Sequence, residues 1–136
     1  MIKRFNRIGR EERGASALEF ALVAPAFIFL LVGISQLGIF FFANAGLNNA
    51  LAEGARFATL YPRPNETQIK ARINASRFGL NPNNVTVSPL VYGTANSSPY
   101  ADMSMSYTLQ LNFIFIETDP ITLTKSRRVY LQPTLS

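Results

Sequence analysis

A long stretch of uncharged residues is the strongest constraint on how this chain can fold. No Asp, Glu, Lys or Arg lies between Glu19 and Glu53, and residues 20–42 contain only Ser35 and Gln36 as strongly polar members. A helix that crosses a membrane needs about 20 apolar residues, and residues 20–42 would reach about 35 Å. A buried core helix is the alternative, but a domain this small has little use for so long an uncharged helix. The sequence therefore predicts a membrane-spanning helix.

The positive charge of the chain is concentrated before this stretch. Residues 1–14 carry five basic and two acidic residues, a net charge of +3, out of +5 for the whole chain. A basic segment can bind nucleic acid, but one that adjoins an apolar helix is better explained by the positive-inside rule. We therefore expect residues 1–14 in the cytoplasm, close to anionic lipid, and the C-terminal part across the membrane.

The composition excludes several classes of function. The chain has no Cys and no His, which removes disulfides, thiolate zinc sites and the usual general base. We find no glycine-rich phosphate loop and no acidic metal cluster, so we expect no metal and no cofactor. Glu117 and Asp119 are close enough in sequence to suggest a carboxylate pair, but they bracket an expected hairpin turn. The sequence therefore does not predict an enzyme.

Glu19 stands at the start of the apolar stretch, five residues after Gly14, the residue with which the basic segment ends. A carboxylate at the mouth of a membrane-spanning segment is costly to bury, which makes Glu19 a candidate functional residue. In the other interpretation its side chain only extends to the cytoplasmic headgroups.

A cleaved signal peptide is a competing interpretation of this region. Ala43-Asn44-Ala45 has the small-residue pattern of a cleavage site, and cleavage after Ala45 would release a secreted domain. The apolar part of a signal peptide has about 7–15 residues, however, and this stretch is longer. Cleavage there would also remove Glu19 and leave that carboxylate without a role.

The motif around Glu19 resembles that of a known family. Gly14, the segment Ala15 to Phe20 with its Glu19, and residues 21–25 (Ala-Leu-Val-Ala-Pro) resemble the amino-terminal signature of TadE-like proteins. These proteins are the minor pseudopilins of the tight-adherence (type IVb, Flp) pilus system. Residues 52–58 also resemble the stretch where the helix of that family leaves the membrane. The resemblance covers roughly residues 13–60.

The resemblance implies that a prepilin peptidase cleaves between Gly14 and Ala15, which makes Glu19 the fifth residue of the mature chain. Family pilins use that glutamate for subunit packing or processing, so Glu19, with Phe20 beside it, is assigned to processing and assembly. Cleavage would free the ammonium group of Ala15, and the Glu19 carboxylate of a neighbouring subunit could neutralise it. Such a pair removes much of the cost of two charges in lipid and sets the axial register between helices.

The implied function is that of a minor pseudopilin in pilus assembly, surface attachment or secretion. The implied partners are the prepilin peptidase, other pilin and pseudopilin subunits and membrane lipid, with no nucleic acid and no small-molecule substrate. The implied location is the bacterial inner membrane, with the C-terminal domain in the periplasm and incorporation into a surface pilus left open. The alternative is an unprocessed single-span membrane protein with an extracytoplasmic binding domain.

The predicted helix has a kink and a face suited to close packing. Pro25 removes a backbone donor and should bend the helix inside the membrane. Pro62 and Pro64 should end it near Tyr61. Small residues recur every fourth position near its end, and this stripe packs either on another subunit or on the protein's own domain. The stripe consists of Gly46, Ala50, Gly54 and Ala58.

A second, short helix is predicted after these prolines. Asn65 and Gln68 have the spacing of a capping box at its start. Ile69 and Ile73 share one face, and Gly79 is the expected C-terminal cap.

The remaining residues have the pattern of an antiparallel sheet. A short strand is expected at residues 85–91, a polar loop at 93–99, and a long half-buried strand at 103–115, where apolar and polar residues alternate. After a turn at residues 118–120, a strand at 121–131 carries Lys125 and Arg127 on its inward side, which requires either a bulge or a charged edge strand.

The sequence thus predicts a pilin-like α+β membrane protein. We expect a basic leader at residues 1–14, a long helix at 15–61 that continues out of the membrane, and a domain at 62–136. The domain combines the short helix with a small antiparallel sheet of about three strands.

Overall fold

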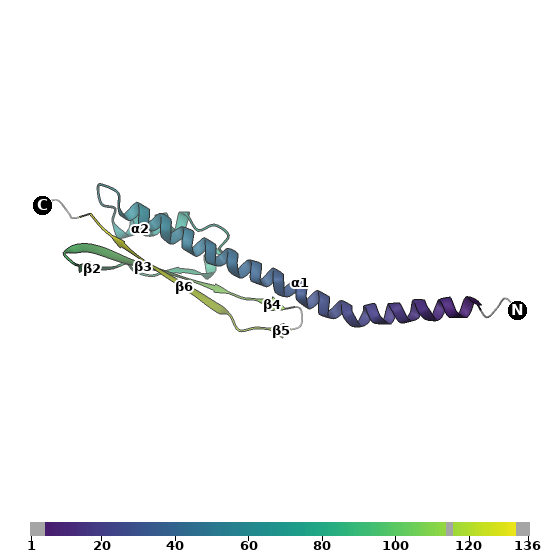
Figure 1. Ribbon diagram of the computed structural model, residues 1–136. Coiled ribbons are helices and arrows are strands. Elements are labelled where there is room, and N and C mark those ends of the chain that lie inside the picture. The colour runs from purple at the N-terminus through teal and green to yellow at the C-terminus, as the bar shows by residue number, and fades with distance from the viewer. Residues whose placement is uncertain (1–4, 114–115, 133–136) are drawn as a thin grey trace.

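The computed structural model describes residues 5–113 and 116–132, and it has the α+β architecture that the sequence predicts (Figure 1). Of these, the side chains of residues 5–13, 116 and 117 are not described. The helices are α1 (Phe5–Ala58), α2 (Glu66–Ala75) and the 3-10 turn η1 (Pro82–Asn84). The strands are β1 (Val85–Val87), β2 (Val91–Ala95), β3 (Ser98–Leu109), β4 (Asn112–Phe113), β5 (Ile116–Glu117) and β6 (Ile121–Tyr130).

Helix α1 is continuous over 54 residues and would measure about 80 Å along its axis. It contains Pro25, a residue that bends helices, and Figure 1 shows a bend in the N-terminal part of α1. No break in the helix separates residues 5–14 from the residues that follow. The helix ends at Ala58, slightly before the expected position, because the N–H groups of Thr59 and Leu60 already bond to carbonyls three residues back.

Helix α2 begins as predicted but ends differently. The side chain of Asn65 accepts a hydrogen bond from the N–H of Gln68, and the Gln68 side chain accepts one from the N–H of Asn65. Ile69 and Ile73 are both buried. The prediction that Gly79 caps the helix is wrong, because the helix ends at Ala75 and Ser76 is the C-cap.

Gly79 instead shapes the loop that follows α2. Its φ of +68° lies in the left-handed region, where glycine is favoured. A Cβ atom at this position would also collide with the ring of Phe42. The glycine therefore lets the loop lie directly against α1.

The main sheet is built around β3. Strand β6 pairs antiparallel with β3 along its length, from Tyr100↔Tyr130 to Leu109↔Ile121. On the other edge of β3, β2 pairs with residues 98–102 and β1 with residues 105–107. The sheet therefore has four strands rather than about three, but β1 and β2 share one edge of β3. A separate two-stranded ribbon is formed by β4 and β5.

Two predictions about this sheet are wrong. The expected polar loop at residues 93–99 is a hairpin between β2 and β3, with Asn96 and Ser97 at φ values of 48° and 62°. Positive φ at both central residues is the geometry of a tight two-residue turn that matches the twist of paired strands. The expected strand at 103–115 is interrupted after Leu109 and resumes as β4, while its last member, Phe115, lies outside the described residues.

The charged side chains on β6 are those of an edge strand. The pairing with β3 runs without a bulge and sets Lys125 opposite Met105 and Arg127 opposite Met103, on the face that carries the core. Among the described residues, β6 pairs with β3 alone. Charge on an edge strand discourages pairing with a further strand, so the edge interpretation holds and the bulge does not.

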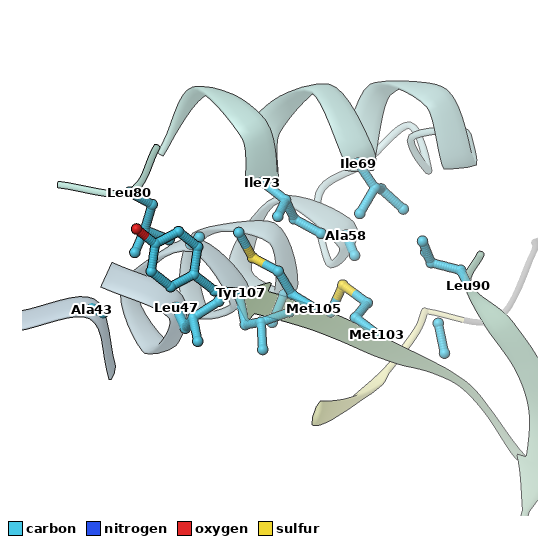
Figure 2. Packing of buried hydrophobic residues seen from close by; sticks show 14 of the residues in the cluster. Ala43, Leu47, Ala58, Ile69, Ile73, Leu80, Leu90, Met103, Met105 and Tyr107 are labelled. Carbon is cyan, nitrogen blue, oxygen red and sulfur yellow. The ribbon is translucent and has the colours of Figure 1, made fainter. Parts of the chain in front are cut away.

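The core lies between the C-terminal part of α1, helix α2 and the sheet (Figure 2). The alternation predicted for β3 is confirmed, since Met103, Met105, Tyr107 and Leu109 are buried. In Figure 2, Ile69 and Ile73 extend from α2 toward the side chains of β3. The largest fully buried side chains come from all three elements and are Leu47, Leu51, Ile69, Ile73, Met103 and Met105.

The stripe of small residues on α1 faces the protein's own domain. Ala50 and Ala58 are buried. A Cβ atom on Gly46 would lie 2.6 Å from the carbonyl oxygen of Phe78, and one on Gly54 would collide with Ile73. Of the two arrangements open from the sequence, the structure has the intramolecular one: the stripe brings α1 into close contact with α2 and the loop after it.

We expect the substitution Gly54→Ala to destabilise the domain. Overpacking against the buried Ile73 should cost about 1–3 kcal/mol, and a gain in helix propensity of about 1 kcal/mol offsets only part of that. The variant should therefore have a lower melting temperature in detergent, measured by circular dichroism. Gly38→Ala is the matched control, because a Cβ atom there meets nothing within 4 Å. An equal effect of both substitutions would contradict the close contact at Gly54.

The candidate membrane and assembly site on α1

The N-terminal part of α1 lies outside the domain. Residues 14–58 form a helix that is long and apolar enough to cross a membrane, and its most apolar window is not buried by the rest of the protein. Large side chains are exposed along it, including Phe20 at 74% and Leu22 at 73%. From residue 14 onward, the first buried side chain on α1 is Ala43.

This exposure needs a covering that the protein itself does not provide. Burying a Leu or Phe side chain stabilises by roughly 1.5–3 kcal/mol relative to leaving it in water. Contiguous exposed apolar surface on this scale marks an interaction surface. A helix of this length and composition fits the hydrocarbon core of a bilayer, which would cover all sides of it at once.

The residues predicted for processing and assembly all lie on this exposed N-terminal part of the helix. Gly14, Ala15, Glu19 and Phe20 are exposed. Ala15 and Glu19 are four residues apart in a continuous helix and therefore share one face. Among the side chains that the structure describes, none forms an ion pair with Glu19. The geometry leaves the Glu19 carboxylate accessible from outside the chain.

Glu53 connects α1 to α2. Its Oε2 atom lies 3.1 Å from Nη2 of Arg56 and 3.0 Å from Nη2 of Arg72. Arg56 lies three residues along the same helix, whereas Arg72 lies on α2, so the second ion pair joins the two helices. The hydrogen bonds from both guanidinium groups hold the pKa of Glu53 below its usual value. A second connection runs from Nδ2 of Asn49 to the carbonyl oxygen of Ser76, at 2.9 Å.

A further contact joins the middle of α1 to the β4–β5 ribbon. Nε2 of Gln36 donates a hydrogen bond to the carbonyl oxygen of Asn112 at 2.6 Å. Beside this bond lies an apolar pocket of about 250 Å³, which we call the α1–β4 pocket. On the ribbon side it is lined by Leu111, Phe113 and Ile121, and on α1 by Gly33, Gln36, Leu37 and Phe40. This contact is not predicted by the sequence, although Gln36 is one of the two strongly polar residues in the apolar stretch.

The described residues offer no arrangement for metal binding. No group of three or more His, Cys, Asp or Glu residues is close enough together in the described part of the chain to hold an ion. Asp119 is exposed in the connection between β5 and β6, and the side chain of Glu117 lies outside the described residues. The carboxylate pair considered from the sequence thus gains no support as a catalytic site.

An apolar helix with exposed side chains, followed by a small α+β domain, is the architecture of a single-span membrane protein. The family model of TadE-like proteins matches residues 14–56 of this chain, which are 43 of its 136 residues. No curated protein and no solved structure matches the chain. The resemblance drawn from the motif is therefore confirmed for the segment that begins at Gly14 and includes Glu19.

We expect Glu53→Gln to destabilise the domain in a pH-dependent way. The folded-state pKa of Glu53 is lowered, so its charge contributes stability above about pH 4.3, and this contribution is lost as the pH falls through the folded-state pKa. The variant should melt below the wild type at neutral pH, and the two melting temperatures should converge in acid. A difference that stays constant from neutral to acid pH would show that the side chain acts through its packing alone.

Proposed function

We propose that this chain is a minor pseudopilin of a tight-adherence (Flp) pilus system, a substrate of the prepilin peptidase and a subunit of the pilus assembly apparatus. The observation that carries the proposal is the TadE-like match, which begins at Gly14 and contains Glu19. A TadE-like segment indicates a protein related to this pilus system. The exposed apolar helix that follows supports a role in which the helix first lies in lipid and then packs with other subunits.

Processing is the first step of the proposed function. Residues 1–14 remain on the cytoplasmic side because of their positive charge, and the peptidase cleaves between Gly14 and Ala15. Gly14 is exposed and a Cβ atom there would meet nothing within 4 Å, so the absence of a side chain is not required by the fold. This supports a requirement set by the peptidase, which must approach the backbone closely at that point.

Assembly is the second step. Cleavage leaves an ammonium group on Ala15 and a carboxylate on Glu19, both within the apolar environment of the helix. A charge at the entrance of the span costs less than the roughly 2.5–3.5 kcal/mol of a charge at the bilayer centre, but the remaining cost still favours an arrangement that joins the two charges. In the proposed arrangement, Glu19 of one subunit pairs with Ala15 of its neighbour. Any other stagger of the two helices separates the charges, which is how the pair would select one register.

The domain has a separate role in this proposal. The major pilin of such systems has almost no globular part, whereas this chain places a folded domain at the end of its helix. The ion pairs of Glu53 and the close contact at Gly54 fix that domain on α1. The domain would therefore be presented on the periplasmic side, in a fixed orientation relative to the helix that enters the assembly.

We expect the mature chain to begin at Ala15. Mass spectrometry of the membrane fraction, from cells with an active prepilin peptidase, should find residues 1–14 removed. Replacement of Gly14 by a bulky residue such as Phe should block this cleavage. Gly38→Phe is a control with the same change at a position of α1 where a Cβ atom also meets nothing within 4 Å, and it should be processed normally.

Two other N-termini would contradict the processing step. An intact Met1 would favour the unprocessed single-span membrane protein with a binding domain. A start at Gly46 would indicate a cleaved signal peptide and a secreted domain.

We expect Glu19→Gln to insert into the membrane but to fail in assembly. The substitution keeps the size and hydrogen-bonding capacity of the side chain and removes its charge, which makes insertion easier. Co-purification of the variant with pilin subunits should be lost, while the domain stays folded because it lies far along α1 from Glu19. Glu12→Gln is the control, since it removes the same charge from the segment that cleavage discards.

Processing has to be measured in the same cells, because the peptidase itself can recognise Glu19. A Glu19→Gln variant that is processed normally and still supports full piliation would rule out the pair between subunits. Glu19 would then pair with Ala15 of its own helix or extend to the headgroups.

A further inference from the structure

The β4–β5 ribbon lies beside the part of α1 that carries the apolar stretch. Figure 1 shows β4 and β5 at the end of the domain that is nearest to the N-terminal part of α1. The hydrogen bond from Gln36 to Asn112 and the α1–β4 pocket place the ribbon beside residues 33–40 of α1. The domain therefore reaches down to a level of the helix that the sequence analysis assigned to the membrane.

The far boundary of the membrane along α1 can be estimated for two possible starts of the span. A span needs about 20 residues, so one that begins at Ala15 reaches its far boundary near Ile34, and one that begins at Phe20 reaches it near Ile39. Both limits fall within the segment that lines the α1–β4 pocket. Whichever limit applies, the ribbon meets the boundary between hydrocarbon and headgroups.

The chemistry of the pocket fits that depth. Its lining is apolar almost throughout, and the one polar side chain in it, that of Gln36, is hydrogen-bonded to Asn112. The pocket is larger than the roughly 150 Å³ apolar cavity that binds benzene in an engineered protein. It continues into the exposed apolar surface of α1, where Leu37 is 57% exposed, and Ile121 on its other side is 39% exposed.

We propose that β4 and the α1–β4 pocket form a lipid-contacting foot of the domain, in which the pocket takes up an acyl chain from the leaflet on the domain's side of the membrane. The inference rests on the membrane-spanning role of α1 in the proposed function, and it does not depend on processing or on pilus assembly. An acyl chain is the occupant because hydrocarbon surrounds the apolar surface into which the pocket opens. The foot sets the height of the domain above the bilayer and limits its tilt.

The test uses the absence of tryptophan from the chain, which allows single-tryptophan reporters. Phe113→Trp in the full chain places a reporter in the wall of the pocket. In vesicles of phosphatidylcholine with bromine atoms near the headgroup end of the acyl chains, it should lose most of its fluorescence. Bromine atoms at the chain ends should quench it less. Leu30→Trp, which lies inside the span for either limit, should be quenched more strongly by bromine atoms at the chain ends than Phe113→Trp is. Tyr61→Trp, beyond the end of α1, should lose no fluorescence with either lipid.

These outcomes separate the inference from the proposed function. If Leu30→Trp is quenched and Phe113→Trp behaves like Tyr61→Trp, the domain stands off the membrane and the foot is ruled out, while the span is retained. If Leu30→Trp is not quenched either, α1 does not cross the bilayer, and the proposed function fails together with the inference.

A pair of glycines tests the pocket itself. A Cβ atom at Gly33 or Gly38 meets nothing within 4 Å, so both positions accept leucine, but only Gly33 lines the pocket. Gly33→Leu should reduce the quenching of Phe113→Trp, because it displaces the acyl chain, and Gly38→Leu should not. The measurement is made at a low ratio of protein to lipid. If quenching appears only when the protein is diluted further in lipid, the helix of a second copy occupies the pocket at the higher ratio, and the proposal fails. Equal effects of the two leucine substitutions would also overturn it.

Discussion

The continuity of α1 is the constraint on which the rest of the structure depends. Large apolar side chains of its N-terminal part are exposed, while its C-terminal part forms one wall of the domain core. Because the helix has no interruption between them, the position of one part determines the position of the other. A movement of the N-terminal part of α1 would therefore carry the domain along with it.

The two parts of the helix use different side chains because they pack against different materials. Phe and Leu project from the part assigned to lipid, where fluid chains adapt to any shape. Small residues occupy the face that meets α2, where Gly54 leaves room for the buried Ile73. The ion pair between Glu53 and Arg72 lies beside this contact. Because ion pairs are directional, it fixes the position of α2 along α1, which apolar contacts alone do not specify. The pocket at residues 33–40 lies between the exposed apolar part of α1 and the part that packs on the domain.

Features of the fold that arise locally were predicted from the sequence. The capping box of Asn65 and Gln68 depends on residues three apart, and the alternation along β3 depends on neighbours in the same strand. Features that depend on partners distant in the chain were missed or misassigned. Gly79 was expected to cap α2, but its position is determined by the ring of Phe42. The hairpin at Asn96 and Ser97 is not predicted by the sequence, because its polar residues have no apolar alternation that indicates a strand.

The sequence by itself determined that the chain has one long apolar helix, that Glu19 stands at its entrance five residues after Gly14, and that a small α+β domain follows. These properties depend on composition and local spacing, which need no knowledge of the fold. Only the tertiary structure decided which surface the small residues of α1 contact, which strand forms the charged edge, and where the domain meets the helix. Each of these requires residues far apart in sequence to approach one another. The hydrogen bond between Gln36 and Asn112 is such a case, since only the position of β4 beside α1 brings these two groups together.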